Sequence, residues 1–209
     1  MIDKIAAGQT DLVFEYIESG HSPTSVDGHG VSLVQWCAYY GDVTAIKFLL
    51  SKGASLDSLG ENYDLNGAAF HGHFQLCQFL LAQGADPNHP LPDTGETPLH
   101  AVLTKANRPV NNQIVGLLLE HGAHPNTQTK PGVETEAFMR DIRTRQETPL
   151  HRAAAYGDAT TIQLLLNAGA DKTLKDMNCD TPLTWASWHL RTRQILSMLC
   201  YGTFSVKID

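Results

Sequence analysis

The stretch "ETPLHRAAAYGD" at residues 147–158 decides the fold, because the chain repeats it several times. Its first half recurs as "ETPLHAV" at residues 96–102, and a third copy is "DTPLTWAS" at residues 180–187. Degenerate copies are "VSLVQWCAYYGD" at residues 31–42 and "NYDLNGAAFHGH" at residues 62–73. Thr can cap the free amides at a helix start, and Pro fits the first helical turn. Each copy therefore predicts the start of a helix.

A second motif follows these copies, as in "TIQLLLNAGAD" at residues 161–171. Its apolar residues are spaced by three and four, which places them on one face of a helix. The glycine that follows fits a left-handed helix C-cap. Successive closing glycines are 33, 31, 38, 47 and 33 residues apart, so three of the five spacings lie near one period of about 33 residues. These glycines are Gly20, Gly53, Gly84, Gly122, Gly169 and Gly202.

The two motifs resemble the G-x-T-P-L-H-x-A-A-x-x-G-H and L-L-x-x-G-A-D-x-N patterns of the ankyrin-repeat family, over essentially the whole chain. The resemblance implies an all-α ankyrin-repeat solenoid of about six stacked helix-turn-helix repeats with β-turn fingers. We expect a single domain over residues 1–209, with repeats at 1–29, 30–60, 61–94, 95–146, 147–178 and 179–209. The first repeat lacks its Thr-Pro box, which suits a terminal unit that must face water.

Two segments depart from the period. The fourth repeat carries about four extra residues near 103–113, and residues 127–146 hold about 14 more than a normal finger. A long surface loop is tolerated because its closure entropy grows slowly with length. Alternatively, such a loop carries function, and Phe138, Met139 and Arg140 are then the candidate contacts.

Composition narrows the class of protein. The 209 residues are 42% hydrophobic and 18% charged, which is typical of a globular chain. A net charge of −7 without any basic run argues against nucleic-acid binding. No window has the roughly 18 apolar residues of a membrane span. The first residues, "MIDKIAAGQTDLVFEY", hold no apolar stretch of signal-peptide length, so we expect an unprocessed intracellular chain.

The cysteines indicate the compartment. Cys37, Cys77, Cys179 and Cys200 form no C-x-x-C pair, which predicts free thiols. We therefore expect a cytoplasmic or other reducing intracellular location. A bacterial effector secreted into a host cytosol is compatible with the same pattern.

No catalytic motif appears, so we predict a chain that is not an enzyme and needs no cofactor. The pairs His71–His73 and His121–His124 do not predict a metal site, because a site needs three or four converging ligands. An enzyme built on the 127–146 insertion would lack a nucleophile and a histidine. The resemblance implies that His100 and His151, in the two "TPLH" boxes, bond adjacent repeats to one another.

The resemblance also implies a scaffold that binds a protein partner, as a monomer in isolation. The contact positions would lie on the concave face, at the last two residues of each first helix and at the finger tips. These helix-end positions are unusually aromatic, and aromatic residues are frequent at interface hot spots. Alternatively, a Tyr in such a position packs on the neighbouring repeat. The candidate helix-end contacts are Tyr39, Tyr40, Phe70, His71, Tyr156, Trp188 and His189. The candidate finger contacts are His29, Asn62, Asp93, Glu96, Arg145 and Asp180.

A second hypothesis makes the chain a substrate or regulatory subunit. Asn88 and Asn126 close "GADPN" and "GAHPN", where the resemblance implies a site for an asparaginyl hydroxylase. Pro87 and Pro125 depart from the pattern of such substrates. Asn also stabilises turns through its side chain, which is the default role.

Overall fold

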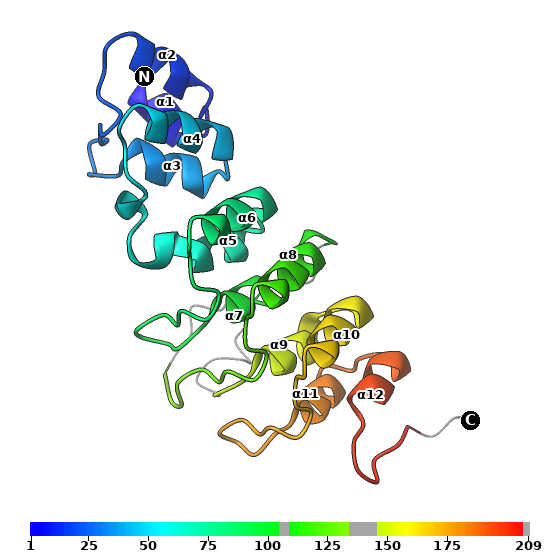
Figure 1. Ribbon diagram of the computed structural model, residues 1–209. Coiled ribbons are helices and arrows are strands. Elements are labelled where there is room, and N and C mark those ends of the chain that lie inside the picture. The colour runs from blue at the N-terminus through cyan, green and yellow to red at the C-terminus, as the bar shows by residue number, and fades with distance from the viewer. Residues whose placement is uncertain (105–108, 134–145, 207–209) are drawn as a thin grey trace. The chain divides into compact units, whose positions relative to one another are not determined.

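The computed structural model describes residues 1–104, 109–133 and 146–206, and these residues form twelve α-helices in six consecutive pairs (Figure 1). The described ranges contain no β-strand, only isolated bridging residues such as the antiparallel bridge between Val26 and Ser32. The all-α repeat architecture predicted from the sequence is therefore confirmed.

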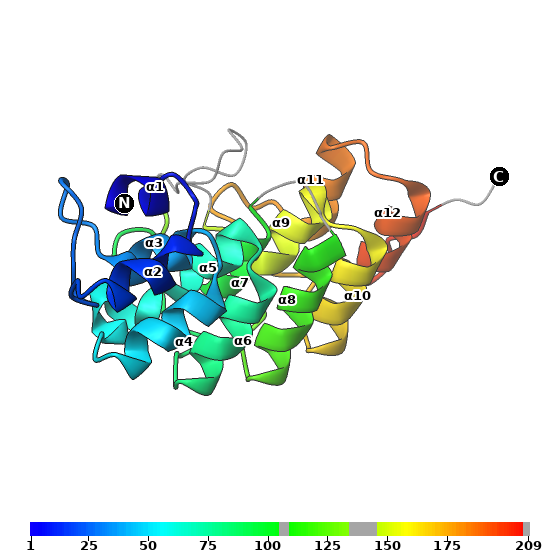
Figure 2. The ribbon, with the colours of Figure 1, turned by 90° about the horizontal axis from the view of Figure 1, so that it is seen from above.

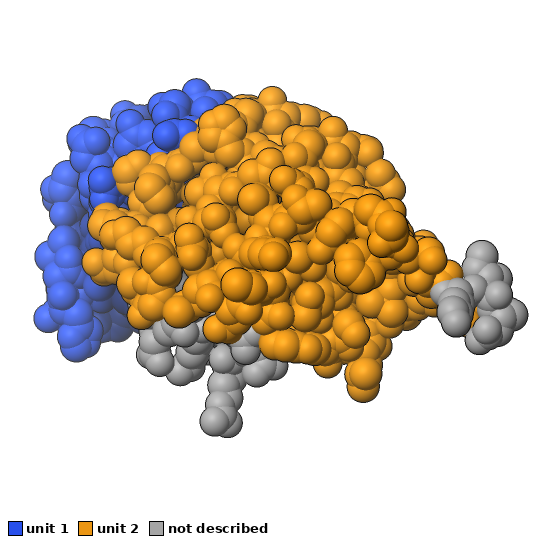
Figure 3. All heavy atoms as spheres, turned by 90° about the horizontal axis from the view of Figure 1, so that it is seen from below, with its two compact units in different colours: residues 1–86 blue, residues 87–209 orange. Residues whose placement is uncertain are grey.

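The chain divides into two compact units, Met1–Asp86 and Pro87–Asp209 (Figure 3). The division falls within the predicted third repeat, 61–94. Unit 1 holds α1 (Ile2–Ala6), α2 (Leu12–Glu18), α3 (Leu33–Tyr39), α4 (Val43–Ser51), η1 (Leu56–Leu59), η2 (Glu61–Asp64), α5 (Leu65–His71) and α6 (Phe74–Ala82). Unit 2 holds α7 (Pro98–Val102), α8 (Pro109–Glu120), α9 (Pro149–Tyr156), α10 (Ala159–Asn167), α11 (Pro182–Trp188) and α12 (Arg193–Leu199).

The second helices of neighbouring repeats lie side by side, α4 against α6 in unit 1 and α8 against α10 in unit 2 (Figure 2). Their apolar stripes are buried, as the three-and-four spacing predicts. The fully buried stripe residues include Ile46, Leu49, Cys77, Leu80, Ile162 and Leu165. Burial also raises the pKa of the Cys37 and Cys77 thiols to about 12, so both are small core residues and not nucleophiles.

The Thr-Pro boxes begin helices as predicted, and each histidine performs two tasks. In α9, Nδ1 of His151 accepts the Thr148 amide at 3.1 Å, so Nδ1 carries no proton. The neutral ring must then hold its proton on Nε2, which donates to the Asp180 carbonyl at 3.1 Å. The ring thus caps its own helix and bonds the next repeat. Burial is the main reason that the pKa of His151 falls to about 4.

His100 repeats this arrangement at α7. Its Nδ1 accepts the Thr97 amide at 3.2 Å, and its Nε2 donates to the Glu147 carbonyl at 3.3 Å. Complete burial holds the pKa of His100 well below its usual value. The predicted role of both histidines in joining repeats is confirmed.

The start of α5 departs from the other helices. Its segment lacks Thr-Pro, and the helix begins one residue later than the aligned start of α9. Asn62, Tyr63 and Asp64 have φ values of 52°, 53° and 52°, in the left-handed region that side chains disfavour. Asp64 then serves as the cap, because its Oδ1 accepts the Gly67 amide at 3.0 Å.

Candidate protein-interaction surface

The helix-end residues of unit 1 form one group of aromatic rings. Tyr39 ends α3 and His71 ends α5, and their ring centroids are 5.1 Å apart, so the contact joins two adjacent repeats. Phe70 contacts His71 at 5.2 Å. Tyr39 is 54% exposed, whereas Phe70 and His71 are half-buried. Tyr39 therefore presents the largest free ring surface of the group.

Tyr40 is held by the preceding repeat. Its hydroxyl donates to the Ala6 carbonyl at 2.8 Å, and its ring lies against Gly8. Its ring also contacts Tyr39 at 5.1 Å between centroids. The packing role that the sequence left open for such tyrosines thus applies to Tyr40, which still remains exposed.

Unit 2 repeats the aromatic arrangement at α9 and α11. The ring centroids of Tyr156 and His189 are 4.8 Å apart and join adjacent repeats. Trp188 is 58% exposed at the end of α11. In each unit, therefore, an exposed aromatic ring accompanies a ring contact between repeats.

The finger residues differ in how free they are. His29 and Asp93 are exposed. The backbone carbonyl of Asp180 accepts a hydrogen bond from His151 Nε2, and its amide donates to Asp176 Oδ1 at 2.9 Å. The half-buried side chain of Asp180 therefore lies beside the junction between two repeats. Arg145 and the insertion candidates Phe138, Met139 and Arg140 lie outside the described residues.

Asn62 and Glu96 have structural contacts that the sequence did not predict. The Asn62 amide donates to the Asp86 carbonyl at 2.9 Å and accepts the Asp86 amide at 2.7 Å. Glu96 was predicted as a finger contact, and this prediction is wrong in placing its side chain at the surface. The residue is only 4% exposed and pairs with Arg152 at 2.7 Å. A buried carboxylate needs such a partner to offset its loss of hydration.

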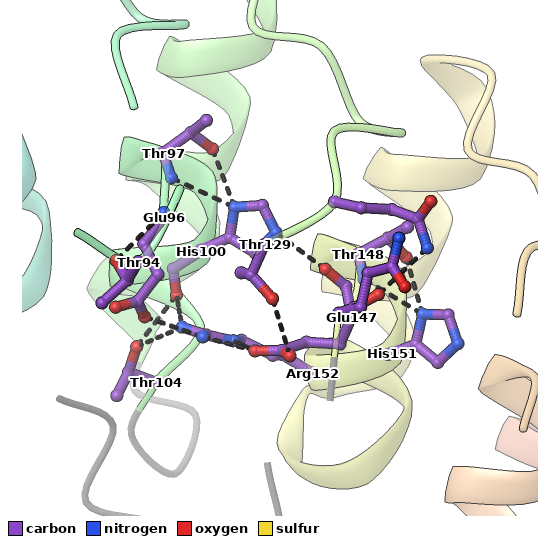
Figure 4. A network of polar contacts seen from close by, with 12 residues as sticks. Thr94, Glu96, Thr97, His100, Thr104, Thr129, Glu147, Thr148, His151 and Arg152 are labelled. Carbon is purple, nitrogen blue, oxygen red and sulfur yellow. Dashed lines mark hydrogen bonds and ion pairs between the residues drawn. The ribbon is translucent and has the colours of Figure 1, made fainter. Parts of the chain in front are cut away.

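Arg152 is the centre of a buried network that sequence reasoning missed (Figure 4). Its guanidinium pairs with Glu96 and Glu147, and its Nε donates to Glu147 Oε1 at 2.9 Å. Its Nη1 donates to the His100 carbonyl and to Thr104 Oγ1, both at 2.9 Å. The signal was present, since Glu precedes both "TPLH" boxes and Arg follows only one.

The ends of the 127–146 insertion meet at the same network. The Thr129 hydroxyl donates to Glu147 Oε2 at 3.0 Å, and its amide donates to the Glu147 carbonyl at 3.0 Å. Gln128 Nε2 donates to the Gln146 carbonyl at 3.0 Å. The fourth and fifth repeats are thereby joined on both sides of the insertion.

The two candidate modification residues bond the backbone of the next repeat through their side chains. Asn88 donates to the Gly122 carbonyl at 2.9 Å and accepts the His124 amide at 2.7 Å. Asn126 donates to the Gly169 carbonyl at 2.9 Å and accepts the Asp171 amide at 2.8 Å. Each side-chain amide bridges to the backbone of the next repeat, so both residues join neighbouring repeats, a role that the sequence did not predict.

Within the described residues, no three His, Cys, Asp or Glu side chains gather as a metal site would require. No helix in the described part of the chain is long and apolar enough to cross a bilayer.

Comparison with known proteins agrees with the repeat pattern. The family described as ankyrin repeats in many copies matches residues 68–110 and 136–186, and the single ankyrin repeat matches residues 94–130. The chain is 29% identical to human palmitoyltransferase ZDHHC13 over 82% of its own length and 31% of that protein. It is 30% identical to mouse B-cell lymphoma 3 protein homolog, over 90% of the chain and 39% of that protein.

Zebrafish palmitoyltransferase ZDHHC17 is 29% identical over 82% of the chain. The chain spans only about a third of the length of these relatives, 31% for both palmitoyltransferases. The part that it matches is their ankyrin region. The repeat spacing, the helix pairs and these matches agree, and the chain belongs to the ankyrin-repeat family.

Proposed function

We propose that this chain binds a protein partner through its helix-end aromatic residues and neighbouring fingers, without catalysing a reaction. Ankyrin repeats are protein-interaction modules, which sets the class of function. The observation that carries the finer proposal is the exposure of Tyr39 and Trp188 at equivalent positions of two repeats. Exposed aromatic side chains bury much apolar area at low entropic cost when a partner covers them.

The proposal assigns recognition and not acyl transfer to this chain. Two relatives are named as palmitoyltransferases, and the chain matches 31% of their length. Ankyrin repeats generally do no chemistry, which supports the assignment. We further propose that the chain acts as a monomeric scaffold. We also propose a cytoplasmic or other reducing compartment, which the four free cysteines support.

The test replaces Tyr39 and Trp188 together by Ser and measures capture of partners from a lysate. Phe204→Ser is the matched control, because Phe204 is 59% exposed and lies outside the helix-end positions. We expect the double variant to lose the captured partners and the control to retain them, with unchanged circular dichroism for both. Full capture by a folded double variant would assign these rings a structural role.

A further inference from the structure

Charge is distributed unequally between the two units. Unit 1 contains ten Asp and Glu residues, three Lys and no Arg, whereas unit 2 contains twelve acidic and twelve basic residues. Unit 1 therefore carries the whole net charge of −7. Such a field attracts cationic ligands and repels phosphates.

A cavity of about 300 Å³ lies in unit 1 between α3 and the η2–α5 segment. Four rings line it, from Trp36, Tyr39, Tyr63 and His71, together with the carboxylate of Asp64. The centroids of Trp36 and Tyr39 are 6.1 Å apart at 83°, so the rings present both faces and edges. Aromatic faces beside a carboxylate are the surroundings that an organic cation prefers.

Trp36 also borders a second cavity, of about 380 Å³, lined by Asp3, Asp27 and His29. The indole Nε1 donates to Asp27 Oδ2 at 3.0 Å, which holds the ring of this shared lining residue in place. The Val31 amide is the main reason that the pKa of Asp27 lies below its usual value, so its carboxylate is ionised near neutral pH. Trp36 thus lines two cavities, each of which also has at least one aspartate in its lining.

The strained start of α5 supplies the first cavity with two of its groups. Tyr63 and Asp64 both line it, and both have a positive φ. Non-glycine residues in this region persist where the surroundings hold them, and they cluster at ligand sites. The strain alone identifies no ligand, but here it coincides with the ring-lined cavity.

None of the three lysines of unit 1 lines either cavity. Lys47 Nζ is 5.4 Å from the Phe79 ring and Lys52 Nζ is 5.4 Å from the Phe48 ring, beside the second helices. Among the described residues, no Lys or Arg lines either cavity or pairs with Asp64. The first cavity therefore offers rings and a carboxylate without a lysine or arginine from the protein itself.

We propose that unit 1 binds a basic segment of a partner protein, with one Arg or Lys side chain in each cavity beside Trp36. This inference rests on the proposed function and names the chemistry of its partner. A volume of about 300 Å³ lies at the small end of ligand pockets, which suits a single side chain. Two cavities that share Trp36 in their linings suit two side chains of one extended segment.

The experiment measures fluorescence anisotropy of a labelled Gly/Ser peptide with spaced arginines, titrated with the full chain. The same peptide with citrulline keeps the shape and removes the charge. We expect Asp64→Asn to weaken arginine-peptide binding about tenfold, the loss of one charge-assisted hydrogen bond. Asn still caps α5 and tolerates a positive φ, so the variant keeps the fold.

The matched control is Asp11→Asn. Asp11 is exposed, makes no side-chain cap bond and lines neither cavity. Its substitution by Asn removes the same single negative charge as Asp64→Asn. We expect its effect to stay within about twofold, as for a screened surface charge. Equal binding of the citrulline peptide, or equal losses in the two variants, would overturn the cavity assignment.

This inference and the proposed function can fail separately. Loss of partner capture in the Tyr39 and Trp188 double variant, without preference for the arginine peptide, would leave the proposed function and overturn the basic segment. If arginine-peptide binding depends on Asp64 while the Tyr39 and Trp188 double variant still captures its partners, the cavity assignment stands and the proposed helix-end surface is overturned.

Discussion

Arg152 is a single residue on which several buried polar groups depend. It compensates two buried carboxylates and two further oxygen acceptors from the preceding repeat. Arg152→Met leaves both carboxylates without a cation, and removing one partner of a buried ion pair costs about 3–5 kcal/mol. We expect a loss of this size in the free energy of unfolding, measured by urea denaturation.

The matched control is Arg193→Met on the exposed side of α12. Surface substitutions of this kind change stability by roughly 0.5 kcal/mol or less. Similar unfolding midpoints for the two variants would show that water or rearrangement compensates the carboxylates, contrary to the burial of Glu147 and Arg152.

His151 predicts a pH dependence. Its pKa is about 4 in the folded chain and about 6.5 when unfolded, so the unfolded chain binds more protons between these values. The contribution of the neutral His151 ring to the free energy of unfolding is therefore fully present above a pH of about 6.5, and it is lost as the pH drops toward 4. The contribution is about 3 kcal/mol at most, and His100 acts in the same direction.

His151→Gln checks this contribution by urea denaturation across the pH range. Gln35 shows that Gln can serve in the same position, since its Oε1 accepts the Ser32 amide at 2.8 Å. We expect the variant to lose much of the acid sensitivity, whereas His124→Gln, on an exposed residue, should retain it. An unchanged pH slope in His151→Gln would contradict the buried neutral ring.

At the scale of elements, the turn between α3 and α4 depends on Gly41. Its φ is 74°, and a Cβ there would lie 2.6 Å from His73 Nδ1. The His73 ring bonds the Tyr39 carbonyl through Nε2 at 2.9 Å, so it cannot move without losing that contact. Gly41→Ala should cost more than the roughly 1–2 kcal/mol of a left-handed residue.

Thermal or urea unfolding of Gly41→Ala and Gly28→Ala tests this prediction. Gly28 has no positive φ, and an added Cβ meets nothing within 4 Å. We expect Gly28→Ala to leave stability nearly unchanged or slightly increased. Equal effects at both positions would mean that the α3–α4 turn relaxes freely.

The sequence predicted helix existence well where a local signal repeats. Thr-Pro boxes, apolar stripes and closing glycines each act within one helix, so they can be read without knowing the fold. The start of α5 could not be predicted, because "NYDLNG" contains no Thr-Pro and its left-handed residues follow from surrounding contacts. Local preferences yield to such contacts where a segment is held from several sides.

At the scale of the whole molecule, the candidate surface was less predictable than the fold. The helix-end positions followed from the repeat, and the exposed rings of Tyr39 and Trp188 are where a partner could reach them. Glu96 was misplaced because its partner, Arg152, is distant in sequence and close only after folding. The division of charge between the units follows from the sequence alone once the boundary after Asp86 is known.

His100 and His151 each couple the folding of their own repeat to that of the next repeat along the chain. His100 completes its bonding only when the backbone of Glu147 is in place, and His151 only when that of Asp180 is. The Nε2 proton of each ring therefore has its hydrogen-bond acceptor only when the next repeat is folded. Such neighbour-to-neighbour coupling spreads order along a repeat array, and the stabilisation is mutual between the two repeats that each histidine joins.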